Sequence, residues 1–440
     1  MAKPKTRNTK KKKKEKKTIE DLTKKELQQW AALDQAANEQ YLAGNYKDAF
    51  ELTRKAMHIF PCSAIQWANL AIFNDKLGRR QEAISCAKRA IELDDQYFMT
   101  YTVLANIYTN MGDIESARRY GRIGLEIRDK LFGGPPPFPH DPPQTLPPPP
   151  SPETRDKNII AFSLFGAKSK YCETAVLNAL AQPEVYPNWT CRFYIDETVP
   201  VHVIRRFVLA RAEVVVMKED DMGRAWPGPM WRFLALKDDL HRVIFRDADS
   251  LLTEKDALAV DAWVKSGKLF HLMRDHGYHT ELILAGLWGC ITGALPPLSQ
   301  LTDTFFSHPL ESVHFADQYF LRQYVWPYAR QSLLHHDSVF GFFNAQPFPL
   351  DMKSDWANTD FHAGLAEGLG TFTHPTSLPD GTPVYWTFFL VDGNERTPVC
   401  TYPGVVHNGV VSDNIPSRYS IMIQKGKAEI RLVSVPDATV

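Results

Sequence analysis

The sequence lacks any run of the ~20 apolar residues that a membrane-spanning helix requires. No apolar segment follows the basic residues 1–17, so we expect neither a secretory signal nor a membrane span. The six cysteines are widely scattered, with no CxxC pair and no short disulfide spacing, which favours reduced thiols. These absences together favour a cytoplasmic protein.

Basic charge is also scarce outside the first residues. Residues 1–17 hold nine Lys, one Arg and one Glu, a net charge of +9, and the whole chain is neutral, so the remainder carries −9. A groove that follows nucleic acid needs basic residues on the folded surface, so a nucleic acid polymer is not expected as a partner. We expect residues 1–25 to form a disordered, Lys-rich tail, with docking to an anionic surface or nuclear import as the alternatives.

A period of 34 residues dominates the N-terminal third. Gly44, Gly78 and Gly112 keep this spacing, and small residues recur in the same register. The small-residue series are Ala49, Ala83 and Ala117, and Ala56, Ala90 and Gly124. Small residues let paired helices approach closely, and each glycine permits the turn between them.

The repeated segment AGNYKDAFELTRKAM and its two counterparts resemble the tetratricopeptide repeat. The resemblance implies an all-α domain of three helical pairs over residues 26–131. Such stacks usually offer a groove to a peptide or partner protein, whereas a spacer or packing platform for an enzyme is the alternative.

Proline marks the next boundary, because eleven prolines fall between Pro135 and Pro152. That density excludes regular helix and favours an extended polyproline II conformation, so residues 132–157 are expected to be a linker.

After the linker, apolar runs of strand length alternate with helical patterns. This texture predicts a Rossmann-like α/β domain with parallel strands over residues 158–370. The expected strands are Ile159–Leu164, Cys191–Ile195, Val214–Met217, Val243–Phe245 and Leu269–Met273. Short alternating runs then predict a small β-rich extension over residues 371–440. Its expected strands are Val384–Val391, Tyr419–Ile423 and Glu429–Val435.

The most informative segment is RVIFRDADS, residues 242–250, in which a buried strand ends in two carboxylates separated by one residue. Ligands in open α/β sheets lie at the carboxyl ends of strands, where Asp247 and Asp249 can both face one divalent cation. Carboxylates and phosphate oxygens are the ligands that Mg²⁺ or Mn²⁺ prefers. The motif therefore predicts a cation that bridges a diphosphate and neutralises it as it leaves.

The longer string MWRFLALKDDLHRVIFRDADSLL resembles the nucleotide-sugar site of GT-A-fold glycosyltransferases, in particular the family 8 type. In those enzymes a helix that carries Arg precedes a strand that ends in DxD. The resemblance implies that Asp247 and Asp249 bind metal and ribose, and that Arg232 contacts the donor diphosphate or sugar. An ordinary salt bridge is the alternative for Arg232.

Further segments match this family in order along the chain. Phe162 and Gly166 belong to a strand that runs into glycine, where such enzymes hold the nucleotide base and ribose. In LAGLWG, Gly286 would let the backbone approach the donor sugar and Trp288 would stack on a pyranose ring, with a turn packed by a core tryptophan as the alternative.

The later matches supply the remaining candidate residues. Asp317 and Gln318 open a helical run, with Asp317 as the expected catalytic carboxylate near the reacting sugar and Gln318 as a ligand contact; a helix N-terminal aspartate is the alternative. The metal would also take a late His, for which His336 is preferred over His407. A polar cluster at a strand end would bind acceptor hydroxyls or donor sugar, with Asp275 as a second catalytic candidate. Its members are Arg274, Asp275, His276 and His279.

The sequence thus predicts a glycosyltransferase that moves a sugar from a nucleotide-sugar, with Mn²⁺ or Mg²⁺, to an unidentified glycan, lipid or protein. The repeats would bind that acceptor or a partner protein. Haloacid dehalogenase-type phosphohydrolases also end a strand in DxD, but here the acidic pairs lie upstream of the motif rather than downstream. The other alternative is a non-catalytic interaction protein with an inactive glycosyltransferase-like domain.

Overall fold

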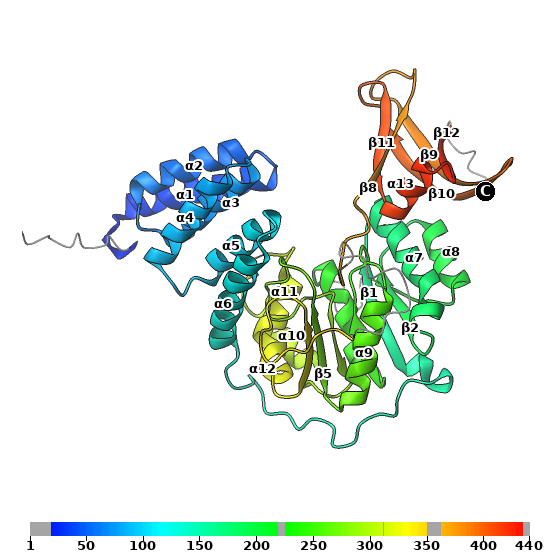
Figure 1. Ribbon diagram of the computed structural model, residues 1–440, viewed down its shortest axis with the longest axis horizontal. Helices are drawn as coiled ribbons and strands as arrows, with labels where there is room; N and C mark the ends of the chain where they lie inside the picture. Colours follow the sequence, from blue (N-terminus) through cyan, green and yellow to red (C-terminus); the bar gives the residue numbers. More distant parts are fainter. Residues whose placement is uncertain (1–18, 219–224, 311, 350–361, 434–440) are drawn as a thin grey trace, which may run out of the picture. The chain divides into compact units, whose positions relative to one another are not determined.

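The computed structural model describes residues 19–218, 225–310, 312–349 and 362–433 (Figure 1). The chain divides into two compact units, Met1–Arg128 and Asp129–Val440. No helix in the described ranges is long and apolar enough to cross a membrane. The Lys-rich residues 1–17 lie outside these ranges.

The first unit contains helical pairs with the expected 34-residue period. The helices are α1 (Lys24–Leu42), α2 (Tyr46–Ile59), α3 (Ala64–Lys76), α4 (Arg80–Leu93), α5 (Phe98–Asn110) and α6 (Ile114–Phe132). Gly44, Gly78 and Gly112 lie in the turns within the three pairs, with φ of +80°, +76° and +73°, a backbone conformation that favours glycine. Ala49 and Ala83 are fully buried, so the small-residue register marks helix contacts, as predicted.

A seven-stranded sheet forms the centre of the second unit, in the order β3-β2-β1-β4-β6-β5-β7. Neighbouring strands are parallel except where they pair with β6. The strands are β1 (Asn158–Leu164), β2 (Thr190–Ile195), β3 (Glu213–Val216), β4 (Arg242–Phe245), β5 (Phe270–Arg274), β6 (Trp288–Ile291) and β7 (Leu333–Asp337). The five predicted strands are confirmed to within one residue at each end.

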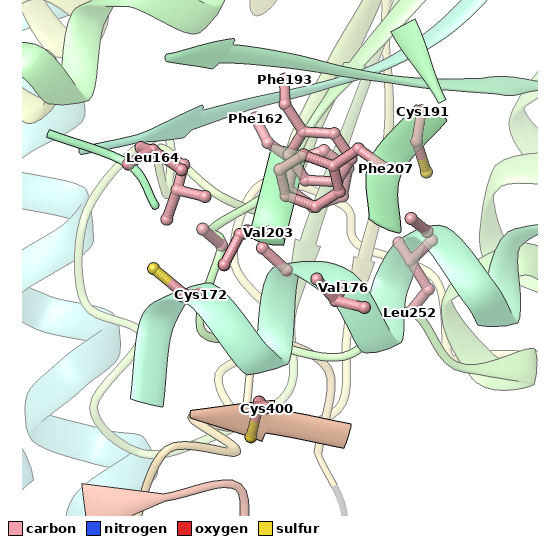
Figure 2. Close-up of a cluster of buried hydrophobic side chains, with 14 of the residues drawn as sticks. Phe162, Leu164, Cys172, Val176, Cys191, Phe193, Val203, Phe207, Leu252 and Cys400 are labelled. Atoms are coloured by element: carbon pink, nitrogen blue, oxygen red, sulfur yellow. The ribbon is translucent and has the colours of Figure 1, made fainter. Parts of the chain in front are cut away.

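Helices and aromatic side chains cover both faces of this sheet. On one face, α7 (Ser169–Val185), α8 (Val201–Leu209) and α9 (Glu254–Ser266) share a core with β1, β2 and β4. Figure 2 shows the part of this core that β1, β2, α7 and α8 contribute. On the other face, the 3-10 helix η3 (Gly228–Lys237) packs Phe233 against Phe245 and Trp288. The helix carrying Arg232 that the resemblance implies before the DxD strand is this 3-10 helix. The remaining helical segments are α10 (Leu298–Phe306), α11 (Ala316–Phe320), the π-helical turn η4 (Leu321–Val325) and α12 (Trp326–Ala329).

The proline-rich segment is held against the second unit. Residues 133–151, here called the proline strap, contain no helix or strand. Arg242 donates hydrogen bonds to the carbonyl oxygens of Pro147 at 2.8 Å and Pro148 at 2.7 Å. A 3-10 helix, η2 (Pro152–Lys157), follows, because the fixed φ of Pro152 suits a first helical position after Ser151.

The C-terminal extension is β-rich, with one correction. Its elements are β8 (Gly370–Pro375), β9 (Pro383–Asp392), β10 (Glu395–Val405), β11 (Val410–Ile415), α13 (Ser417–Gln424) and β12 (Ala428–Val433). The strand predicted at residues 419–423 is wrong, because this segment forms α13. Tyr419, Met422 and Ile423 contact the core, and their i, i+3, i+4 spacing fits one helix face.

A buried carboxylate joins this extension to the helices of the α/β region. Glu173 of α7 is fully buried, and each of its carboxylate oxygens lies 2.8 Å from Arg206 Nη1. The hydroxyl groups of Tyr402 and Tyr419 donate to the same carboxylate at 2.7 and 3.1 Å. Cys400 of β10 belongs to the same core and lies beside α7 in Figure 2. The extension therefore continues the core of the sheet.

Candidate functional site

The carboxyl ends of β1 and β4 border a pocket of about 620 Å³. These strands are parallel neighbours, so their carboxyl ends meet at one edge of the sheet, where α/β proteins bind ligands. The segment after β4 contributes Asp247 and Asp249, and η3 contributes Arg232. Asp317 and Gln318 of α11 and Gly166 after β1 also line the pocket, so the structure brings together six of the predicted site residues.

The two aspartates of the DxD segment have different surroundings. The Asp247 side chain is 47% exposed, whereas burial, together with the nearby charge of Asp247, raises the pKa of Asp249 to about 6. Mg²⁺ is usually bound by one or two carboxylates plus substrate phosphates and waters. Asp247 and Asp249 therefore fit a cation whose other ligands come from a diphosphate. Among the described residues, no cluster of three His, Cys, Asp or Glu could hold a metal alone.

Arg232 connects the DxD segment to α11. Its Nη1 donates to Asp247 Oδ1 at 2.6 Å, and its Nη2 donates to Asp317 Oδ2 at 2.9 Å. Only 4% of the Arg232 side chain is exposed, so this is a buried bridge between two carboxylates rather than a surface salt bridge. Burial raises the pKa of Asp317, and the charge of Arg232 opposes that rise. Arg232 therefore sets the charge balance of the pocket.

Residues 283–286 form a wall behind Asp247. The Gln318 amide fits this wall when its nitrogen donates to the Ile283 carbonyl at 2.8 Å and its oxygen accepts from the Ala285 N–H at 3.1 Å. A Cβ atom on Gly286 would lie 2.1 Å from Asp247 Oδ2. The expectation that Gly286 makes room for a sugar is therefore replaced: its missing side chain makes room for the Asp247 carboxylate.

Two predicted ligand contacts are core residues, so these predictions are wrong. Phe162 is fully buried and stacks on Phe193, with ring centroids 4.8 Å apart. Trp288 is fully buried in β6, where it stacks on Phe245 at 4.3 Å. Side chains alternate between the faces of a sheet, so aromatic rings within strands β1 and β6 face the covering layers rather than the open edge.

The polar cluster after β5 does not line the pocket. Its side chains form hydrogen bonds and an ion pair with neighbouring parts of the protein. Arg274 is buried and donates to the carbonyl oxygens of Glu281 at 2.6 Å and Leu282 at 2.5 Å. Asp275 accepts from Lys255 Nζ at 2.6 Å and from Ser338 Oγ at 2.6 Å. These bonds fix the loop after β5, so both side chains have structural partners in place of the predicted acceptor.

The histidines of the prediction also lie away from the pocket. His276 stacks on His362 at 4.3 Å, and His279 Nδ1 accepts from the Asp275 N–H at 3.0 Å. His336 Nδ1 lies 3.1 Å from His271 Nε2, and burial lowers the pKa of His336 to about 4. In the sheet order β7 is three strands from β4, roughly 14 Å at ~4.8 Å per strand. The prediction that His336 joins Asp247 and Asp249 on one metal is therefore wrong.

Several residues that line the pocket were not predicted from the sequence. Among them are Phe165, Lys168, Tyr171, His314 and Phe315. Phe165 is 44% exposed and Phe315 is 52% exposed, so an aromatic ring stands on each of two walls. Phe165 adjoins the predicted Gly166, which also lines the pocket, and this adjacency was the available signal. Nothing in the local pattern distinguished His314 or Phe315.

The N-terminal residues are similar to known repeat proteins. Two family models described as tetratricopeptide repeat match residues 67–97 and 99–142. The chain is similar to the TPR repeat-containing thioredoxin TTL4 of Arabidopsis thaliana, with 30% identity over 95 residues. It is also similar to DnaJ homolog subfamily C member 7 of Mus musculus, with 34% identity over 86 residues. These matches cover 22% and 19% of this chain and only 14% and 17% of the two relatives.

Solved structures with similar segments are also repeat domains. The TPR domain of Sgt2 from Aspergillus fumigatus matches 24% of this chain and 68% of its own, with 23% identity and a TM-score of 0.22. The first TPR of Spaghetti (RPAP3) bound to an HSP90 peptide matches 23% of this chain and 79% of its own, with 22% identity and a TM-score of 0.22. By the family models and the 34-residue period, the N-terminal part of this chain consists of tetratricopeptide repeats, followed by a mixed α/β region with a largely parallel sheet.

Proposed function

We propose that the second unit is a glycosyltransferase that takes a nucleotide-sugar donor and Mn²⁺ or Mg²⁺ in the pocket beside Asp247. The observation that carries the proposal is the joint placement of Asp247, Asp249, Arg232 and Asp317 in one pocket at the carboxyl edge of parallel strands. Fold resemblance alone would not carry a function, because one fold hosts many chemistries.

The pocket suits a diphosphate ester. Asp247 and Asp249 would hold the cation, which would stabilise negative charge as the nucleotide diphosphate leaves. Lys168 also lines the pocket and adds a positive charge near the phosphates. The exposed rings of Phe165 and Phe315 offer flat apolar surfaces for a nucleoside or a sugar face.

Within this proposal Asp317 is the carboxylate placed near the reacting sugar. Arg232 Nη2 holds its Oδ2 at 2.9 Å, which fixes its position before a ligand arrives. The acceptor would be a glycan, lipid or protein that reaches the open side of the pocket. The tetratricopeptide repeats would bind a protein, either that acceptor or a partner, because stacks of such helical repeats offer an extended binding surface.

The test is a thermal-unfolding series with Mn²⁺ and uridine or guanosine diphosphate. A ligand that binds only the native state raises its stability, so wild type should melt at a higher temperature when both are present. Asp247→Asn and Asp249→Asn should remove this shift, and Asp303→Asn, on exposed Asp303 of α10, should retain it. Wild type without any such shift would refute the donor site.

Turnover decides between an enzyme and a non-catalytic binding protein. Nucleotide-sugars would be screened for Mn²⁺-dependent hydrolysis or transfer, with products identified by mass spectrometry. We expect the turnover rate of both Asn variants to fall at least about a hundredfold, because each would lose the charge stabilisation that the cation supplies. A loss of ~1.4 kcal/mol corresponds to tenfold in rate. Donor binding without hydrolysis of any sugar-nucleotide would favour an inactive glycosyltransferase-like domain.

A further inference from the structure

The two edge strands of the seven-stranded sheet differ in how they are covered. At one end, the chain around Gln346 lies along β7: the Gln346 N–H donates to the His335 carbonyl at 2.7 Å, and the Asp337 N–H donates to the Gln346 carbonyl at 3.0 Å. At the other end, β3 pairs with β2, and no second strand among the described residues covers its outer side. An uncovered strand edge is a surface on which another strand can pair.

The outward backbone groups of β3 belong to Val214 and Val216. The Met217 N–H donates to the Ile195 carbonyl of β2 at 2.7 Å, and the backbone groups of successive strand residues point to opposite sides. Val215 therefore faces β2, as Met217 does, whereas Val214 and Val216 present their N–H and C=O groups to the open edge. No backbone group of the described residues pairs with these outward groups.

An apolar patch of α8 adjoins this open edge. Arg206 Nη1 lies 2.8 Å from the carboxylate of Glu173 on α7, which identifies the side of α8 that faces α7. With ~3.6 residues per turn, Val201 and Val208 lie on the opposite side of the helix. Because α7 covers β1 and β2 whereas α8 contacts β3, that side faces the free edge. Val201 and Val208 are 62% and 63% exposed, so apolar surface is left uncovered beside the open strand.

A second copy of this chain complements both features at once. A separate extended peptide would pair with Val214 and Val216 but would leave Val201 and Val208 exposed. A twofold axis that pairs β3 antiparallel with β3 of a second copy places both α8 helices on the same face of the joined sheet. The same apolar surface then meets itself across the axis, as a twofold interface requires.

We propose that the β3 edge, defined as β3 together with Val201 and Val208 of α8, joins two copies of this chain into a dimer with one continuous sheet. Val214 pairs with Val216 of the second copy, because these residues carry the outward groups, and the twofold axis then passes beside Val215. Val215 lies opposite its own counterpart as a non-hydrogen-bonded pair, with Cα atoms ~4.5 Å apart. The β3 edge is separate from the proposed donor pocket, which none of its residues lines.

Sedimentation velocity of the full chain over a range of concentrations tests the dimer. The interface is a small one, so we expect a reversible, concentration-dependent equilibrium between monomer and dimer. Val208→Lys brings like charges together at the apolar contact and should raise the dissociation constant at least about tenfold. Leu180→Lys is the matched control, because Leu180 is 57% exposed and lies on α7, over the inner strands. Its dissociation constant should stay within about twofold of wild type.

Val216→Pro tests the backbone pairing. Proline removes the outward N–H of residue 216 and leaves the hydrogen bonds between β3 and β2 in place, a substitution that an edge strand tolerates. The variant should keep the circular dichroism spectrum of wild type and sediment as a monomer.

Cysteine crosslinking tests the register. Val215→Cys should form a disulfide-linked dimer under mild oxidation, because Cα atoms ~4.5 Å apart lie within the span of a disulfide. Val216→Cys is the control: residue 216 is more exposed than residue 215, but its counterpart in the second copy lies diagonally across the pair, ~7–8 Å away. Wild type, oxidised in the same way, reports any crosslinking through the native thiols.

Several results would overturn the proposal. They are a wild type that stays monomeric at every concentration, a dimer that persists in both Val208→Lys and Val216→Pro, equal weakening by Leu180→Lys and Val208→Lys, or crosslinking of Val216→Cys but not of Val215→Cys. A monomeric wild type that binds extended peptides along β3 would assign this edge to a strand of another protein instead.

Discussion

Gly286 stands directly against Asp247, so that a Cβ atom at position 286 would lie 2.1 Å from Oδ2 and 2.4 Å from the carboxylate carbon. On its other side the same carboxylate is held by Arg232 at 2.6 Å. Asp247 is thus fixed from both sides although almost half of its side chain is exposed. This arrangement keeps a carboxylate in one orientation at the edge of a pocket before any ligand binds.

Gly286→Ala should displace Asp247. The added methyl group overlaps the carboxylate, and overpacking of this kind costs about 1–3 kcal/mol. Urea unfolding should show that loss, and the combined Mn²⁺ and nucleotide diphosphate shift should disappear. Gly134→Ala is the control, because a Cβ there meets no atom within 4 Å. A full ligand response in Gly286→Ala would contradict the proposed role of Asp247.

Arg232→Met should destabilise the fold by leaving the buried Asp317 carboxylate without its cation. Breaking a buried ion pair typically costs about 3–5 kcal/mol. Protonation of Asp317 removes the unpaired charge, so the loss should shrink as the pH falls. Urea unfolding at about pH 7.5 and about pH 5 checks this. The double variant Arg232→Met/Asp317→Asn should be more stable than Arg232→Met alone, and losses that simply add would argue against the bridge.

The raised pKa of Asp249 predicts in which direction the stability of the folded state changes with pH. Its folded pKa of about 6 lies above the ordinary value of 3.8, so the folded state binds the proton more tightly. The resulting stabilisation is full below pH 3.8 and is lost as the pH rises through 6. Asp249→Asn should therefore gain stability relative to wild type between about pH 5 and pH 7.5. Cation binding needs the ionised carboxyl, so the Mn²⁺ effect on wild type should weaken below about pH 6; a flat profile would contradict this.

Arg242→Met should release the proline strap. Arg242 is buried, burial lowers its pKa to about 10, and its guanidinium donates hydrogen bonds to the carbonyl oxygens of Pro147 and Pro148. Without these bonds, residues 133–151 should be cleaved faster by a nonspecific protease, as followed by mass spectrometry. Lys157→Met, which removes a bond to exposed Asp239, is the control and should cleave at the wild-type rate.

The repeats and the sheet edge could be predicted because they depend on local pattern. The spacing of Gly44, Gly78 and Gly112 reports a turn geometry that glycine satisfies, and the structure places all three at positive φ. Asp247 follows an apolar strand, and the end of a parallel strand is where a side chain reaches the ligand edge. Both inferences need only a few consecutive residues and a known period.

The errors came from side chains whose roles depend on distant partners. The LAGLWG segment predicts that Trp288 stacks on a sugar, but only the pairing of β6 between β4 and β5 shows that Trp288 lies in the core. Arg274 and Asp275 resembled a ligand cluster, yet their acceptors and donors lie at Glu281, Leu282 and Lys255. The position of His336 required the strand order, which no single strand reveals.

The buried Glu173 makes the α/β region and the C-terminal extension depend on each other for folding. Its charge is neutralised by Arg206 of α8, while two of its hydrogen bonds come from Tyr402 and Tyr419 beyond residue 370. A fragment that stopped before β8 would keep the anion and lose both hydroxyl donors, together with the aromatic cover that keeps water away. The smallest fragment of the second unit that folds autonomously should therefore reach at least β12, and natural shortening of this protein from its C-terminus would be selected against at the level of folding, before any effect on ligand binding arose.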